Sequence, residues 1–163
     1  MNIKIICVGT LKERYWREAE AEYLKRLSRF AKVEVVEIRE ARSSAKQGAA
    51  EEAAARRAEG EAIMRAVMKP GGKQGYVITL DINGRDLSSE ALADKISSTG
   101  LGGRSDIAFI IGGSTGLSGE VLDASDMRLS FGQKTYPHQM MRIILEEQIY
   151  RSFKINAGET YHK

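Results

Sequence analysis

The order of apolar and polar positions divides the chain into short strand-like runs and longer stretches with helical spacing. Apolar runs predict strands at residues 3–8, 33–40, 76–80 and 106–111. Apolar residues at helical spacing predict helices at residues 14–30, 41–68, 88–101 and 140–153. Strands alternating with helices are typical of an α/β fold, with a mostly parallel sheet flanked by helices. No linker is long enough to divide the chain, so we expect one domain over residues 1–163.

The predicted helix at residues 41–68 has an unusual composition. It is rich in alanine, glutamate and arginine and has little apolar bulk before Ile63, so its first half has little to bury. Gly48 and Gly60 are expected to weaken it, and Pro70-Gly71-Gly72 is expected to end it. The sequence leaves the role of this helix open.

Two local signals surround the next predicted helix. Asp81-Ile82-Asn83-Gly84 is a strong turn signal directly after the strand at residues 76–80. Ser88 or Ser89 is expected to cap the helix that follows. The inward-facing residues of that helix are expected to be Leu92, Ile96 and Leu101.

Two glycine-containing loops near the end of the chain indicate a ligand cleft. The strand at residues 106–111 ends in Gly112-Gly113-Ser114-Thr115-Gly116. A second loop, from Gly132 to Pro137, follows a short segment at residues 127–131 and leads into the last helix. Glycines after a buried strand allow a ligand to approach backbone N–H groups. One Gly-Gly pair is more often a tight turn, but two such loops can converge at one edge of a parallel sheet, which favours a cleft.

Charge and hydropathy exclude few classes of function. The formal net charge of +3 is compatible with a nucleic-acid partner but does not predict one. No apolar run approaches the length of a membrane span, and the N-terminal stretch lacks the pattern of a signal peptide. We therefore expect a cytoplasmic protein.

Familiar motifs for other chemistries are missing from the sequence. Neither Val8-Gly9-Thr10 nor Gly112-Gly113-Ser114-Thr115-Gly116 has the spacing of a dinucleotide-binding fingerprint, and there is no P-loop or nucleophile elbow. Two histidines and one cysteine form no zinc pattern, so no metal is expected. Cys7 lies in an apolar run and is interpreted as a small buried residue rather than a nucleophile.

The last predicted helix is apolar around more than half of its circumference, which predicts burial both by its own sheet and by a second subunit. His138, Arg142 and Glu146 share one stripe of this helix. That stripe is either an ion-paired surface or a place where Arg142 has a functional role.

Together, several motifs resemble the ribosomal RNA large subunit methyltransferase H family, a group of small SPOUT-class methyltransferases. The resemblance covers essentially the whole chain, from Val8-Gly9-Thr10-Leu11-Lys12-Glu13 to Tyr161-His162-Lys163. Between these ends, the matching motifs are Tyr15-Trp16, Thr79-Leu80-Asp81, Ile111-Gly112-Gly113-Ser114-Thr115-Gly116-Leu117, Leu129-Ser130-Phe131 and Thr135-Tyr136-Pro137-His138-Gln139-Met140-Met141-Arg142.

The resemblance implies a deep C-terminal trefoil knot, with knot and cofactor cleft within about residues 75–156, and a homodimer. It implies methylation of N3 of a pseudouridine in a 23S rRNA stem-loop on assembled ribosomes, with S-adenosylmethionine as cofactor. The cofactor positions carry over onto Leu80, Gly112, Phe131, Gly132, Gln133, Lys134, Thr135 and Tyr136. Gly132 and Lys134 stand where other members often carry serine and an apolar residue.

Methyl transfer from a sulfonium needs alignment of the reacting atoms and removal of the N3 proton. Our hypothesis is that Arg142 stabilises the developing anion or a nearby phosphate. His138, or His162 of the C-terminal tail, is the candidate proton acceptor or base contact, and the tail completes the partner subunit's site. The basic residues of the first helix, with Arg128 and Arg151, are candidate phosphate contacts.

Three alternatives stay open. The chain is a SPOUT methyltransferase with another RNA target, a non-catalytic RNA- or ribosome-binding factor, or a flavodoxin-like nucleotide-binding enzyme. A binding factor would lack cofactor turnover, and a flavodoxin-like enzyme would bind FMN or NAD instead of S-adenosylmethionine.

Overall fold

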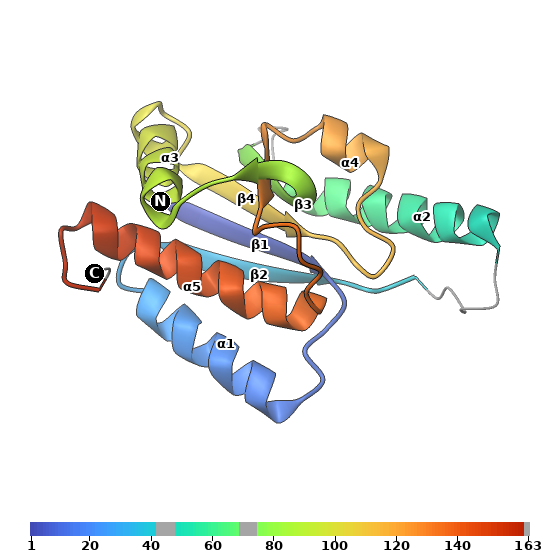
Figure 1. Cartoon of the computed structure of the whole chain (residues 1–163), viewed down its shortest axis with the longest axis horizontal. Helices are drawn as coiled ribbons and strands as arrows, with labels where there is room; N and C mark the ends of the chain where they lie inside the picture. Colours follow the sequence, from blue (N-terminus) through green and yellow to red (C-terminus); the bar gives the residue numbers. More distant parts are fainter. Residues whose placement is uncertain (42–47, 69–74, 162–163) are drawn as a thin grey trace.

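A parallel sheet of five strands forms the centre of the protein, in the order β2-β1-β4-β3-β5 (Figure 1). The computed structural model describes residues 1–41, 48–68 and 75–161. The strands are β1 (Asn2–Val8), β2 (Lys32–Ile38), β3 (Tyr76–Asp86), β4 (Asp106–Ile111) and β5 (Met127–Ser130). The predicted α/β architecture with a parallel sheet is confirmed.

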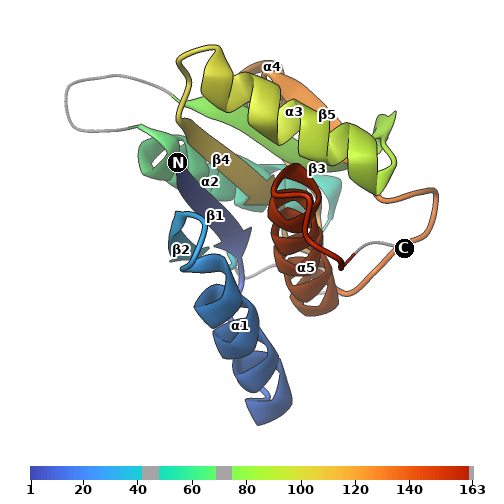
Figure 2. The same ribbon diagram turned by 90° about the vertical axis from the view of Figure 1, so that its left-hand side faces the viewer.

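Helices cover both faces of the sheet. They are α1 (Arg14–Leu27), α2 (Ala49–Val67), α3 (Ser89–Leu101), α4 (Gly119–Asp123) and α5 (His138–Asn156). α5 packs between α1 and α3 on one face (Figures 1 and 2), whereas α2 and α4 pack on the other. Among the described residues, no helix is both long and apolar enough to cross a membrane.

The burial of β1 explains why its sequence is apolar at every position except Asn2 and the half-buried Lys4. Ile3 and Ile5 belong to the core cluster under α1, α3 and α5, together with Leu145. Ile6 and Val8 belong to the second cluster, under α2 and α4. Because successive residues of a strand point to opposite faces, a sheet covered on both sides needs apolar residues at every position.

The predicted turn at residues 81–84 is wrong. β3 continues to Asp86, and its pairing with β5 shifts register between Leu80 and Arg85, so the segment forms a bulge. A Cβ on Gly84 would lie 2.7 Å from the backbone carbonyl of Arg128, so only glycine fits here. The neighbouring strand β5 pairs with both sides of the bulge, and this pairing overrides the local turn signal.

Helix ends also differ from expectation. Leu92 and Ile96 are buried as predicted, but Leu101 is 87% exposed because α3 ends there, beyond the edge of the core. The predicted cap is confirmed at Ser88, whose hydroxyl accepts a hydrogen bond from the N–H of Ala91 at 3.2 Å.

The second helix is shorter than predicted. α2 begins at Ala49, and Gly48 is its N-cap rather than a weak point inside it. Residues 49–54 are exposed, which confirms that the first half of the helix buries little. Residues 42–47 of the predicted helix and the predicted stop at residues 70–72 lie outside the described residues.

Candidate functional site

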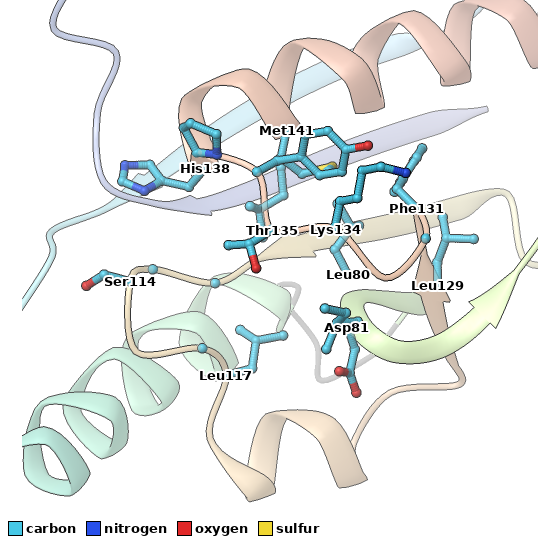
Figure 3. A pocket seen from close by; sticks show the side chains of 18 of the residues that line it. Leu80, Asp81, Ser114, Leu117, Leu129, Phe131, Lys134, Thr135, His138 and Met141 are labelled. Carbon is cyan, nitrogen blue, oxygen red and sulfur yellow. The ribbon is translucent and has the colours of Figure 1, made fainter. Parts of the chain in front are cut away.

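A cavity of about 790 Å³ opens where the carboxyl ends of β3, β4 and β5 meet the start of α5. Figure 3 shows its two walls: the loop after β4, which carries Leu117, and the loop before α5, which carries Thr135. The carboxyl edge of a parallel sheet is the usual place for a ligand in such folds. The volume is in the range of small-molecule sites, roughly 300–1,000 Å³.

Most of the predicted cofactor residues line this cavity. They are Leu80, Gly112, Phe131, Gly132, Lys134, Thr135 and Tyr136. Gln133 is exposed and not part of the lining, and its side-chain amide donates to the backbone carbonyl of Ile82 at 3.3 Å. Gln133 therefore supports the loop on its outer side.

The structure adds lining residues that the sequence analysis did not select. Asp81 and Ile82 line the cavity, although the sequence placed them in a turn. Met141 reaches it from α5, one turn into a helix whose apolar residues were interpreted as core and dimer contacts. Only the bulge of β3 and the position of α5 bring these side chains to the cavity.

The loop after β4 folds into a tight turn. The N–H of Gly116 donates to the carbonyl of Gly113 at 3.1 Å, and Gly116 has a φ of +76°. A Cβ on Gly112 would lie 3.1 Å from the side chain of Leu117, which folds back over it. Glycine is therefore required by the geometry of this turn, which leaves backbone close to the cavity.

Ser130 anchors the second loop. This buried hydroxyl accepts a hydrogen bond from the N–H of Gly132 at 3.1 Å and donates to the carbonyl of Ile82 at 3.2 Å. Gly132 has a φ of +91°, a conformation that L residues rarely adopt. The end of β5 is thus tied to the bulge of β3, which holds the wall formed by residues 131–137.

His138, the first residue of α5, lines the cavity. A Cβ on Gly9, at the end of β1, would lie 3.0 Å from the imidazole Nε2 of His138. Gly9 has a φ of +92°, so both its conformation and its lack of a side chain suit this close contact. Of the two candidate catalytic residues that the structure describes, His138 and Arg142, His138 is the one that lines the cavity.

Arg142 lies inside the protein rather than along the cavity lining. Its guanidinium donates to Glu37 of β2 at 2.7 Å and forms ion pairs with Glu20 of α1 and with Glu146. Burial, reinforced by the neighbouring Glu20 carboxylate, raises the pKa of Glu146 to about 9. Of the two interpretations of this helix stripe, ion pairing is the one observed, with the guanidinium buried and its partners ranging from the buried Glu146 to the exposed Glu37.

Cys7 lies beside this cluster. Burial raises the pKa of its thiol to about 12, so the thiolate needed of a nucleophile is not formed near neutral pH. The interpretation of Cys7 as a buried core residue is confirmed.

The C-terminal tail folds back on α5. The hydroxyl of Tyr161 donates to Glu147 at 3.2 Å, and its ring packs against Tyr150 and under the guanidinium of Arg151. These contacts lie three helical turns away from His138. The third catalytic candidate, His162, lies outside the described residues.

The basic residues considered for RNA binding are largely engaged in ion pairs within the chain. On α1, Arg14 pairs with Glu18 and Arg26 pairs with Glu22. Arg128 lies between Asp81 and Asp123, and Arg151 pairs with Glu147. In the described ranges, no group of three or more histidine, cysteine or acidic side chains is arranged to hold a metal ion.

Comparisons with known proteins identify the family of this chain. A family model described as "Predicted SPOUT methyltransferase" matches residues 1–162. Ribosomal RNA large subunit methyltransferase H of Clostridium novyi (strain NT) is 50% identical over 163 residues, covering 100% of both chains. The proteins of that name from Carboxydothermus hydrogenoformans and Lactobacillus helveticus are 50% and 48% identical, again over 100% of both chains. The chain therefore belongs to the SPOUT methyltransferase family and, within it, to the ribosomal RNA large subunit methyltransferase H group.

Proposed function

We propose that this protein methylates N3 of a pseudouridine in a stem-loop of 23S rRNA on assembled ribosomes, in the cytoplasm, with S-adenosylmethionine as methyl donor. The observation that carries the proposal is the cavity between two glycine loops, with His138 at its edge. It occurs in a chain that is about half identical, over its full length, to proteins named for methylation of large-subunit rRNA.

The lining of the cavity suits this cofactor. Leu80, Leu117 and Phe131 provide apolar surface for a flat adenine ring, and the turn at residues 112–116 provides close backbone for polar groups. Asp81 and Lys134 are of opposite charge, as are the ammonium and carboxylate of the cofactor's amino-acid part. When bound, the cofactor supplies a methyl group on a positively charged sulfur.

The residues of the chain must then orient the uracil ring and receive the proton of N3. His138 is our candidate for the proton acceptor, since its imidazole lines the cavity and its ring is positioned by Gly9. For Arg142 we propose a positioning role: it holds the first turns of α5 against α1 and β2, and this part of α5 carries both His138 and Met141.

We also propose a homodimer through the open face of α1 and α5. Tyr15 at the start of α1 is 61% exposed, Met140 of α5 is exposed, and Ile143 and Ile144 are only half-buried. Exposed and half-buried apolar side chains on neighbouring helices are typical of a subunit interface.

The place of the tail supports a role in the partner's site. Tyr161 contacts Tyr150 and Arg151, which lie roughly 18 Å from His138 along the helix axis. Two further residues extend a chain by at most about 7 Å. Because Tyr161 is anchored far from His138 along α5, we propose that His162 acts across the dimer.

The proposed trefoil knot involves residues after β5. The chain leaves the edge strand β5 and then passes back across the sheet, so that α5 lies between the earlier helices α1 and α3. Such a return path supports threading of the C-terminal part. Single-molecule stretching from both termini tests the knot, because a tightened knot shortens the unfolded contour length, whereas the full extended length would exclude it.

Methyl transfer from labelled S-adenosylmethionine to ribosomes that lack the modification tests the function. Naked rRNA and separate subunits are the parallel substrates, and N3-methylpseudouridine is assayed in the product. Incorporation into assembled ribosomes alone is the expected result. Cofactor binding without incorporation would indicate another RNA target, and a lack of both would indicate a ribosome-binding factor.

A further inference from the structure

The glycine turn at residues 112–116 has a second side, which rests on α2. A Cβ on Gly113 would lie 2.9 Å from the side chain of Val8 and 3.4 Å from Oε2 of Glu59. At the next position of α2, a Cβ on Gly60 would overlap the hydroxyl oxygen of Ser118. The pair Glu59-Gly60 is thus a place where α2 closely approaches the segment that forms the cavity wall.

Glu59 is an unusual residue to find there, because its side chain is only 5% exposed. Its Oε1 accepts a hydrogen bond at 2.9 Å from the N–H of Ala41, which follows β2. Its Oε2 is buried without a hydrogen-bond partner among the described residues. Burial raises the pKa of the Glu59 carboxyl, the N–H of Ala41 opposes that rise, and the Glu40 carboxylate adds to it.

Among the residues that the structure describes, one oxygen of this buried carboxyl has no partner, and core packing alone does not account for such an arrangement. The segment that Glu59 binds is itself connected to the turn. The hydroxyl of Ser114 donates to Glu40, the neighbour of Ala41, at 3.1 Å. Glu40, shortly after β2, therefore contacts the turn directly. Its neighbour Ala41 is held by the Glu59 carboxyl, which also lies behind Gly113.

We infer that Glu59 is a positioning residue for the cofactor-binding turn: by joining Ala41 to the back of Gly113, it sets the conformation in which the turn binds the cofactor. This inference rests on the proposed function and assigns α2 a role in it. A turn that is already ordered loses less conformational entropy when the ligand binds. Loss of Glu59 should therefore weaken cofactor binding more than it slows methyl transfer at saturation.

Three variants separate positioning from packing. Glu59→Met removes the acceptor of the Ala41 N–H but keeps an unbranched buried side chain of similar length. Glu59→Gln keeps an oxygen acceptor for that N–H. Glu61→Met makes the same change at an exposed position of the same helix and serves as the matched control.

Binding of S-adenosylmethionine by calorimetry and the melting temperature are measured for each variant, with KM and kcat on ribosomes. For Glu59→Met we expect Kd and KM about tenfold higher, because the turn is less ordered before binding, with kcat maintained and the melting temperature lowered by the loss of the Ala41 hydrogen bond. Glu59→Gln and Glu61→Met should bind like the parent. Parental affinity in Glu59→Met would overturn the inference, and so would an equal loss in Glu59→Gln, because the acceptor would then be irrelevant.

Amide hydrogen exchange of the free protein tests the inference without any ligand. Residues 112–116 should exchange faster in Glu59→Met than in Glu61→Met, while the exchange of α5 stays unchanged. Unchanged exchange at the turn would overturn the inference. A parent protein that binds no S-adenosylmethionine would instead refute the proposed function, and the exchange result would still decide whether Glu59 orders the turn.

Discussion

Arg142 of α5, whose guanidinium is buried, donates a hydrogen bond to the carboxylate of Glu37 on β2 at 2.7 Å. The exposed Glu37, the half-buried Glu20 and the buried Glu146 surround this guanidinium. One positive charge does not compensate the two carboxyls that are shielded from solvent, Glu20 and Glu146. Retention of a proton by Glu146 removes part of this excess, in agreement with its raised pKa.

Replacement of Arg142 by methionine should destabilise the fold strongly. Removing one partner of a buried ion pair typically costs about 3–5 kcal/mol, because the remaining charges lose their compensation. Urea unfolding measures the loss, and Arg57→Met, at an exposed position of α2, is the control and should change little. Unchanged stability with abolished methylation would instead make Arg142 a catalytic residue.

The free energy of unfolding should depend on pH through the ionisation of Glu146. Its pKa of about 9 in the folded protein exceeds the ordinary value of 4.5, so the folded state keeps a proton that the unfolded state has released. The contribution of this group is complete below about pH 4.5 and is lost as the pH rises toward about 9. Glu146→Gln should flatten this decline in urea midpoints measured from pH 5 to 9. The same slope in variant and parent would show that Glu146 is already ionised.

Gly132→Ala tests the conformation of the loop before α5. No neighbouring atom lies within 4 Å of the added Cβ, so the φ of +91° is the source of strain. The expected cost is roughly 1–2 kcal/mol, with weaker binding of S-adenosylmethionine as the loop relaxes. Gly119→Ala also adds a Cβ in open space but at an ordinary φ. It should leave both the stability and the affinity for S-adenosylmethionine unchanged. Equal behaviour of the two variants would contradict this view of the loop.

His138→Asn should separate chemistry from cofactor binding. If the imidazole receives the N3 proton, the rate at saturating cofactor and ribosomes falls by about 10²–10⁴-fold while the Kd for S-adenosylmethionine stays within about twofold. Gln139→Ala, at the next position of α5, is the control. A variant with the parental rate would exclude His138 as the proton acceptor.

Mixed dimers should show whether the tail acts across the dimer. A chain lacking residues 161–163 and a full-length His138→Asn chain are each expected to be inactive but folded. In a mixed dimer, the truncated chain supplies a cavity with an intact His138, and the His138→Asn chain supplies an intact tail. If the tail acts across the dimer, this combination restores one complete site. Methylation by the mixture, and by neither protein alone, would support action in trans. No recovery in mixed dimers verified by mass would contradict it.

Much of this protein follows from its sequence. Apolar runs and helical spacing located all four predicted strands and the helices between them, because residues buried on both faces of a sheet must be apolar at every position. The two glycine loops were also evident, since glycine marks a backbone that turns sharply or is closely approached. These features depend on neighbours within a few positions. Most of the residues that the resemblance assigns to the cofactor also line the cavity.

Only the tertiary structure decided the features that depend on distant partners. Asp81 and Ile82 form a bulge instead of a turn because β5 pairs beside them, and Leu101 is exposed because the core ends before it. Two partners of Arg142, Glu37 and Glu20, come from β2 and α1, and Glu37 is more than a hundred residues away in the chain. No local pattern encodes such pairs, because burial and charge compensation are set by whichever elements the fold brings together.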